Sequence, residues 1–306
     1  MDVLCLGESM CVFAPATAGP LRTAVELHAG VAGAESNVAV ALARLGAHAA
    51  WHGKVGDDPF GLRIKDVLEE AGVDCAGIGT DPARPTGVYF KDPGPEGTVV
   101  HYYRRGSAAS TMGPGHLDGL EPPKILHLSG ITPALSESCA ALVEELLVRR
   151  ALAPAVVSFD VNYRPALWPV EEAGPVLARL ADAADIAFVG LDEAQVLWGV
   201  KTPEDVRDRV PDAAVLVVKD GGNGVTAFDG EERHYTAAEP VDVVEPVGAG
   251  DAFAAGFLYG RLQDASVAAS MRLGHRLAAG ALQTVGDLAP PPSPRPFEPS
   301  WRTSDR

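Results

Sequence analysis

The sequence predicts an α/β fold in which a doubly wound, mostly parallel sheet carries helices on both faces and is accompanied by a small β-sheet lid. Through most of the 306 residues, short apolar runs typical of buried strands alternate with longer helical patterns. This alternation indicates parallel strands joined by right-handed crossovers. Two stretches, residues 10–32 and 86–106, carry strand-like residues without helices, which favours one separate antiparallel sheet.

The first strand and helix show the pattern clearly. An apolar run at residues 3–6 predicts a buried strand that ends at Gly7. Residues 35–45 predict a helix, because their apolar side chains fall on one face and Gly46 follows them. The later strands are expected at 49–56, 125–128, 156–160, 186–189 and 215–218, and the later helices at 60–71, 136–150, 171–183 and 192–198.

The domain boundaries follow from the two stretches that lack helices. Residues 10–32 and 86–106 are expected to form the lid, in which a turn rich in Pro and Gly at 92–97 joins two strands as a hairpin. A Pro-rich tail at 287–306 cannot continue a helix and is expected to be poorly ordered. The α/β core then comprises residues 1–9, 33–85 and 107–286.

Composition excludes several classes of partner. The chain has 25 Lys and Arg against 41 Asp and Glu, a net charge of −16, which disfavours nucleic acid and anionic membrane surfaces as partners. Its four cysteines show no metal-binding spacing and are expected to be reduced thiols. We found neither a signal peptide nor a long apolar run, so a soluble cytoplasmic protein is expected.

The strongest chemical signal lies in one turn and the helix that it opens. Strand-like residues 241–244 lead into Gly248, Ala249 and Gly250, after which a helical pattern begins. Unpaired backbone N–H groups at a helix start form an anion hole, and glycines let a phosphate approach closely. Asp251 would lie beside that hole, where a carboxylate can accept a proton from a hydroxyl that attacks a γ-phosphate.

Three other interpretations of this turn are a simple helix cap, a dinucleotide-binding fingerprint and a P-loop. Asp251 can simply cap the helix, and the motif alone does not decide between a cap and a base. The glycine spacing does not fit the dinucleotide-binding fingerprint, and no P-loop sequence occurs.

A second glycine-rich segment precedes the helix at residues 35–45. Gly30 and Gly33 permit a tight entry, and Asn37 lies inside the helix, where asparagine is mildly unfavourable. Its amide could bind sugar hydroxyls, but, taken alone, the segment is better explained by a solvent-facing asparagine or one that serves as an inner cap.

Two arginines point to a carboxylate ligand. Tyr102 and Arg104 are two apart in a predicted strand and so share a face, and Arg164 follows a core strand at the ligand-binding end of the sheet. Two guanidinium groups suit a carboxylate through bidentate bonds. The alternative makes Arg104 and Arg105 a solvated pair on a strand edge, and Arg164 a loop residue.

Three segments together resemble the two signature regions of the ribokinase-like (PfkB) carbohydrate kinases, in the right order and spacing. They are residues 33–46, 53–61 and 247–257. The resemblance implies a Rossmann-like main domain and transfer of the γ-phosphoryl group of ATP to a sugar hydroxyl. It implies Asp251 as the catalytic base. The anion hole would be supplied by Gly248, Ala249 and Gly250.

The same resemblance implies the nucleotide and metal contacts. Lys219, Gly222 and Gly224 look like the family's nucleotide loop, and His275 falls near the expected position of adenine, although a helical histidine is more often a surface or internally bonded residue. Glu193 looks like the glutamate of the N-x-x-E motif that orients Mg²⁺ through water.

Two positions depart from the family pattern. Gly190 stands where that motif has asparagine, and Glu245 stands where aspartate is usual. The second change neighbours the family's monovalent-cation site and leaves a potassium (K⁺) requirement open.

Three further segments resemble the 2-keto-3-deoxygluconate kinases within the family. They are residues 101–110, 127–136 and 160–164. This implies a sugar-acid substrate phosphorylated at its 6-hydroxyl. A homo-oligomer formed through the lid is also expected. The alternatives are a fructokinase- or ribokinase-type kinase of a neutral sugar and a non-catalytic sugar or nucleotide sensor. The implied substrate contacts are Gly33, Asn37, Tyr89, Tyr102, Arg104 and Arg164.

Overall fold

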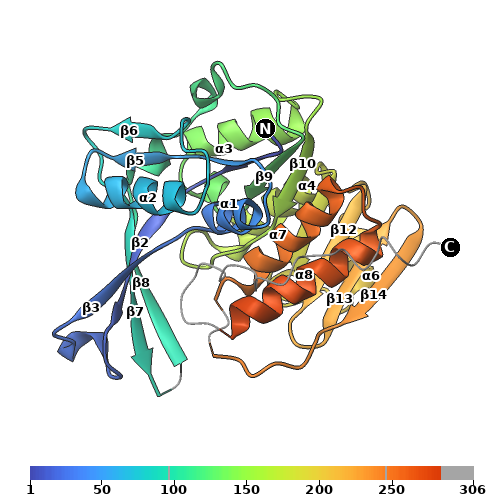
Figure 1. Ribbon diagram of the computed structural model, residues 1–306. Coiled ribbons are helices and arrows are strands. Elements are labelled where there is room, and N and C mark those ends of the chain that lie inside the picture. The colour runs from blue at the N-terminus through green and yellow to red at the C-terminus, as the bar shows by residue number, and fades with distance from the viewer. Residues whose placement is uncertain (96, 245–246, 284–306) are drawn as a thin grey trace.

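The computed structural model describes residues 1–95, 97–244 and 247–283 and shows a layered α/β core with a smaller sheet projecting from one side (Figure 1). The core sheet has eight strands in the order β14-β13-β12-β11-β10-β9-β1-β4. The strands from β12 to β4 are parallel, and β13 and β14 add an antiparallel hairpin at one edge. Their bounds are β1 Val3–Leu6, β4 Ala49–His52, β9 Ile125–Ser129, β10 Val156–Asp160, β11 Ile186–Gly190, β12 Val215–Asp220, β13 Gly224–Asp229 and β14 Glu232–Ala237.

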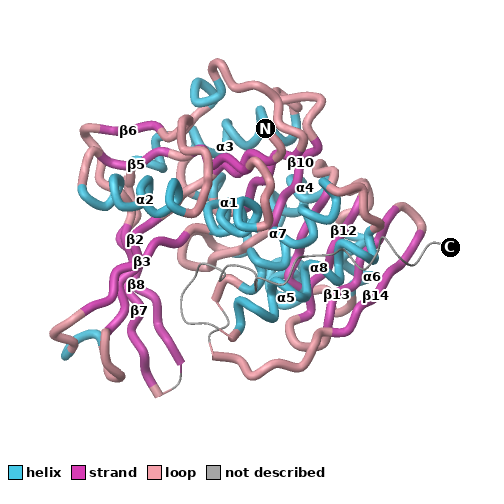
Figure 2. Tube along the Cα trace, in the orientation of Figure 1, coloured by secondary structure: helices cyan, strands magenta, loops and turns pink. Residues whose placement is uncertain are grey.

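Helices cover both faces of this sheet, as the sequence predicts (Figure 2). The helix bounds are α1 Ala34–Arg44, α2 Pro59–Glu70, α3 Glu137–Val143 with a π-helical extension at Glu144–Val148, α4 Val170–Asp182, α5 Leu191–Trp198, α6 Pro203–Arg209, α7 Ala249–Leu262 and α8 Val267–Leu282. Short 3₁₀ helices lie at Leu21–Thr23, Ala108–Thr111, Pro114–Leu117 and Thr132–Ala134. The start of α2 shows why one of these helices begins where it does, because the Asp58 carboxylate accepts the N–H groups of Phe60 and Gly61.

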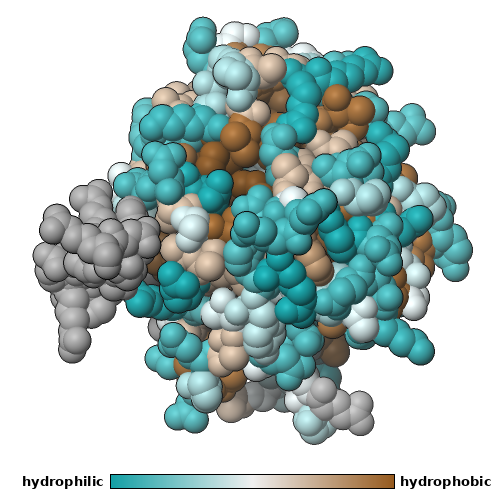
Figure 3. Space-filling model, turned by 90° about the vertical axis from the view of Figure 1, so that its right-hand side faces the viewer, coloured by the Kyte–Doolittle hydropathy of each residue, from teal (hydrophilic) through white to brown (hydrophobic). Residues whose placement is uncertain are grey.

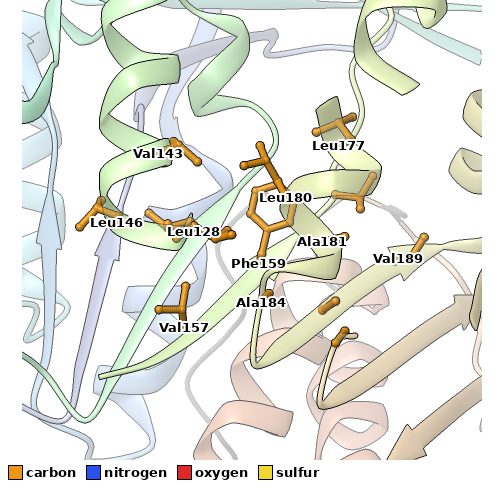
Figure 4. Close-up of a cluster of buried hydrophobic side chains, with 14 of the residues drawn as sticks. Leu128, Val143, Leu146, Val157, Phe159, Leu177, Leu180, Ala181, Ala184 and Val189 are labelled. Atoms are coloured by element: carbon orange, nitrogen blue, oxygen red, sulfur yellow. The ribbon is translucent and has the colours of Figure 1, made fainter. Parts of the chain in front are cut away.

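Two apolar cores lie on opposite faces of the sheet because successive strand residues point to opposite sides. In β1, Leu4 and Leu6 pack toward α3–α6, whereas Val3 and Cys5 pack toward α1, α2, α7 and α8. Figure 4 shows the first core, where Phe159 of β10 lies beside side chains of α4. The strands are therefore apolar on both faces, which is why they appear as short continuous apolar runs in the sequence.

The small sheet contains β2 (Met10–Pro15), β3 (Leu27–Ala32), β7 (Val88–Gly94) and β8 (Gly97–Tyr103) in the order β3-β2-β7-β8. Its central strands β2 and β7 run parallel, so the expectation of a purely antiparallel sheet is wrong. The chain leaves the core for this sheet twice in the same direction, and each excursion returns through an antiparallel partner. A further pair, β5 (Lys54–Gly56) and β6 (Gly79–Asp81), forms a separate two-stranded sheet.

The segment before α7 differs from its prediction. Residues 241–244 form no strand; Val243 and Val244 are each 58% exposed, and the N–H of Val244 donates to the carbonyl oxygen of Leu282 at the end of α8. The apolar run at 241–244 therefore contacts the end of α8 and does not pair with a strand of the sheet. The hairpin of β13 and β14, which precedes it, is absent from the prediction.

Two further expectations concern the C-terminal tail and membrane-spanning helices. The predicted Pro-rich tail at 287–306 lies outside the described residues. Among the described helices, none is long and apolar enough to cross a bilayer. Hydrophilic residues dominate the face of the molecule shown in Figure 3, in keeping with the high content of acidic residues.

Candidate active site

A cavity of about 420 Å³ lies between the core and the small sheet. On the core side it is lined by residues at the carboxyl ends of β10 and β12 and at the first turns of α1 and α7. Ligands of doubly wound sheets bind at this end of the parallel strands. The small sheet closes the cavity from the other side with Met10, Ala32, Tyr89 and Tyr102.

The start of α7 borders this cavity and has N–H groups that no helical hydrogen bond of the described residues uses. Gly248 precedes the helix with a φ of 81°, a left-handed conformation that favours glycine. The first helical hydrogen bond runs from the N–H of Ala252 to the carbonyl oxygen of Gly248, so Ala249 and Gly250 have N–H groups without a helical partner. Gly248 and Gly250 line the cavity, and the end of the helix dipole adds a favourable potential for an anion there.

Asp251, in the first turn of α7, is held by a residue from α1. The Nδ2 atom of Asn37 donates to Oδ2 of Asp251 over 2.8 Å, and the N–H of Gly33 lies 3.5 Å from Oδ1 of Asn37. All three residues line the cavity. Asn37 is therefore neither solvent-facing nor a simple inner cap, because its amide faces the carboxylate of Asp251.

Gly33 is required by close packing. A Cβ atom at this position would lie 2.3 Å from the backbone oxygen of Glu8, so only glycine lets α1 begin against the segment between β1 and β2. This contact brings Asn37, one turn later, beside Asp251.

Burial shifts the pKa of two acids in the cavity. It raises the pKa of Asp251 to about 7, although the hydrogen bond from Asn37 opposes this shift. Burial together with the nearby charge of Asp160 raises the pKa of Glu193 to about 7. Acids with such raised pKa values in a cleft are typical of functional sites.

Lys219 forms a buried ion pair that the sequence did not reveal. Its Nζ atom lies 2.7 Å from Oδ2 of Asp160, the last residue of β10, which is 2% exposed. Burial lowers the pKa of Lys219, but Asp160 and Glu193 outweigh this effect, and the net shift is upward. The signal that could have found Asp160 is its place as a carboxylate at the carboxyl end of an otherwise buried strand.

Gly190 and Glu193 form a local bond at the start of α5. The N–H of Gly190 donates to Oε2 of Glu193 over 3.2 Å. A Cβ at Gly190 would lie 3.0 Å from the same oxygen, so glycine suits this arrangement of the glutamate. The backbone thus orients Glu193 although the asparagine of the family motif is missing.

The two predicted arginines line the same cavity in different settings. Arg104 follows the end of β8, and its guanidinium carbon lies 5.6 Å from the ring centre of Tyr102. Its side chain is only 7% exposed and pairs with Glu8. The interpretation of Arg104 as a solvated edge residue is therefore wrong. Arg164 is 41% exposed, and its Nη1 atom lies 3.8 Å from Oε1 of Glu193.

Three predicted nucleotide contacts do not line this cavity. Gly222 lies in the exposed turn between β12 and β13, and Gly224 begins β13. His275 on α8 is 8% exposed, its Nε2 lies 3.2 Å from the carbonyl oxygen of Thr236, and its ring packs edge-on against Phe253. These contacts match the alternative of an internally bonded helical histidine.

Seven charged side chains line the cavity. The acids outnumber the bases, and among the described residues no group of three His, Cys, Asp or Glu side chains is arranged to hold a metal ion by itself. Glu245, on which the potassium question depends, lies outside the described residues. The charged residues are Asp160, Asp192, Glu193, Asp251, Arg104, Arg164 and Lys219.

Comparison with known proteins identifies the family. Residues 1–294 match the pfkB family of carbohydrate kinases. The chain belongs to this family. Among curated pfkB relatives, a 2-dehydro-3-deoxygluconokinase from Bacillus subtilis is 37% identical, covering 94% of this chain and 91% of the relative, and one from Thermoproteus tenax is 34% identical, covering 97% and 93%.

Solved structures share the fold of this chain. A PfkB protein from Polaromonas sp. JS666 has a TM-score of 0.86 at 33% identity and covers 94% of this chain and 98% of its own. An uncharacterized sugar kinase from Pyrococcus horikoshii, solved in complex with ATP, has a TM-score of 0.83 at 25% identity, with coverages of 94% and 95%. The predicted α/β fold and carbohydrate kinase activity are thereby confirmed.

Proposed function

We propose that this pfkB kinase transfers the γ-phosphoryl group of ATP to the 6-hydroxyl of 2-keto-3-deoxygluconate, also called 2-dehydro-3-deoxygluconate. The observation that carries the proposal is the cavity itself, where Asp251 at an anion-binding helix start shares the space with Arg104 and Arg164. The identity of 34–37% to two enzymes named for this reaction supports the substrate. The product is 2-keto-3-deoxy-6-phosphogluconate.

Asp251 serves as the general base in this proposal. As the hydroxyl oxygen of the sugar bonds to the γ-phosphorus, its proton passes to Asp251, and the bond from that phosphorus to the β-phosphate oxygen breaks to release ADP. A pKa of about 7 keeps the carboxylate largely unprotonated just above neutral pH while it can still hold the proton. The N–H groups at Gly248, Ala249 and Gly250 stabilise charge on the transferring group.

Lys219 and the turn after it are proposed to hold ATP, with Gly222 and Gly224 contributing. His275, which is buried against Phe253 and bonded to Thr236, is left out of the ATP site. Mg²⁺ supplies neutralisation of the phosphate charge when it is bound with ATP. The donor set fits such an ion, because Asp160 and Glu193 lie close enough for the charge of one to raise the pKa of the other. Because the described residues hold no cluster of three direct ligands, Glu193 would act through water.

The sugar acid is proposed to contact Gly33, Asn37, Tyr89 and Tyr102, with its carboxylate near the two arginines. A guanidinium group forms stronger, charge-assisted hydrogen bonds with a carboxylate than with the hydroxyl of a neutral sugar. This argument favours the sugar-acid kinase over a fructokinase- or ribokinase-type enzyme.

A coupled assay of ADP release tests the proposal. Purified protein with ATP and Mg²⁺ would be offered 2-keto-3-deoxygluconate, its galactonate epimer, fructose and ribose. The kcat/KM for the sugar acids is expected to exceed that for the neutral sugars by about a hundredfold, in line with the loss of a charged hydrogen bond. A preference for fructose or ribose would establish the neutral-sugar alternative, and sugar binding without ADP release would establish the sensor.

We further propose that two copies associate through the outer face of the small sheet. Phe13 and Phe90 stack there at 5.2 Å, and Tyr103 packs edge-on against Phe90. Val99 and Tyr103 on this face are 59% and 65% exposed, and the edge of β8 has no neighbouring strand in the described sheet. Light scattering is expected to give a dimer for the wild type and a monomer for Val99→Asp; a monomeric wild type would overturn the proposal.

A further inference from the structure

Glu8 occupies the junction between the core and the small sheet. It lies between β1 and β2, where the chain first leaves the core, and Arg104 lies just after β8, where the chain returns. Figure 2 shows the strands of the small sheet projecting from one side of the core. The segment that enters β7 also lies beside Glu8. A Cβ atom at Gly87, just before β7, would lie 2.9 Å from Oε1 of Glu8.

The carboxylate of Glu8 is buried and fully engaged. Its Oε2 accepts the Nε–H of Arg104 over 2.7 Å and also pairs with Nη2 of the same guanidinium. Its Oε1 accepts the hydroxyl of Ser107 over 2.6 Å. The side chain of Glu8 is 1% exposed and does not line the cavity, so it cannot touch a substrate there.

The ion pair with Glu8 limits which N–H groups of Arg104 can bind a ligand. A guanidinium binds a carboxylate most often through a two-donor edge. Glu8 occupies the Nε–Nη2 edge of Arg104, so that edge is not available for the bidentate bond expected from the sequence. The other two-donor edge, Nη1–Nη2, is left for a ligand carboxylate, and the direction in which this edge points depends on Glu8.

We infer that Glu8 is a positioning residue that sets the orientation of Arg104 toward the carboxylate of the sugar acid, with Ser107 holding Glu8 in turn. The inference rests on the proposed function, since it concerns the anionic group of that substrate. A buried ion pair contributes little net stability, and its fixed geometry is the property that a binding site can use. Glu8 thus determines substrate specificity without contacting substrate.

The test compares Glu8→Gln, Arg104→Ala and the double variant, with thermal unfolding measured for each. Glu8→Gln preserves shape and removes the charge that holds the guanidinium. It is expected to raise KM for the sugar acid about tenfold and to leave kcat and the KM for ATP within about threefold. Ser107→Ala, which leaves the ion pair in place, is expected to give a smaller change in the same direction.

The double variant separates positioning from a structural role. If Glu8 acts through Arg104, Glu8→Gln adds less than about twofold to the KM of Arg104→Ala. It also restores thermal stability to that variant, because it removes an unpaired buried charge. Additive increases in KM, or equal losses of kcat and of affinity for ATP, would overturn the inference. A wild type that does not phosphorylate sugar acids would instead overturn the proposed function and the carboxylate role of Arg104 with it.

Discussion

Asn37 donates a hydrogen bond of 2.8 Å to Asp251, although the two residues are 214 positions apart in the chain. Each lies in the first turns of its helix, α1 for Asn37 and α7 for Asp251, and both helices begin at the same cavity. The bond orients the carboxylate and lowers its pKa, against the larger effect of burial. It therefore links the glycine-rich start of α1 to the proposed base.

Asn37→Ala is expected to shift the pH dependence of activity. A base acts only when it is unprotonated, so kcat/KM should fall as the pH drops through about 7, where Asp251 takes up its proton. Without the hydrogen bond from Asn37, the pKa of Asp251 rises, and the acidic limb of the profile moves to higher pH. Rates measured from pH 5.5 to 9 check this shift. Gln195→Ala, an exposed amide on α5, should keep the wild-type profile, and an unmoved limb in Asn37→Ala would contradict the link.

Asp251→Asn tests the base itself. The substitution preserves size and removes the ability to accept a proton, so kcat is expected to fall by about two or more orders of magnitude. Single-turnover or coupled ADP-release rates, with the unfolding temperature as a check on folding, provide the measurement. The exposed Asp66 on α2 offers a matched control, and Asp66→Asn should remain fully active. Near-normal turnover by a folded Asp251→Asn protein would exclude the assigned role.

Lys219→Ala is expected to reduce both stability and nucleotide affinity. The substitution leaves Asp160, which is 2% exposed, without its partner 2.7 Å away. Breaking a buried pair in this way costs about 3 kcal/mol or more, measurable by denaturant unfolding. Adding Asp160→Asn should recover much of the stability but not the KM for ATP. Recovery of both would show that Lys219 has no contact with the nucleotide.

Arg164→Ala is expected to discriminate between acidic and neutral sugars. Its guanidinium is 41% exposed and faces the cavity near Glu193, so a ligand carboxylate can reach it. The KM for the sugar acid should rise about tenfold or more, with a much smaller change for a neutral sugar. Steady-state kinetics on both substrates measure the ratio, and Arg209→Ala, at an exposed position of α6, serves as the control. Equal losses on both substrates would remove the carboxylate argument.

Much of the fold was predictable because its signals are local. The parallel core strands are buried on both faces and therefore appear as apolar runs, and the residues from Gly248 to Asp251 mark the start of α7 within four positions. The parallel pairing of β2 with β7 was not predictable from those runs, because strand direction depends on where the chain re-enters the sheet.

The sequence by itself determined the α/β class, the small second sheet and most of the residues that share the cavity. Only the tertiary structure decided their partners: Asn37 with Asp251, Asp160 with Lys219, and Glu8 with Arg104. The last two pairs are 59 and 96 positions apart. The hydrophobic periodicity of a sequence indicates which face of a helix or strand a side chain occupies. An ion pair or a pKa shift depends instead on groups that folding brings together from distant parts of the chain.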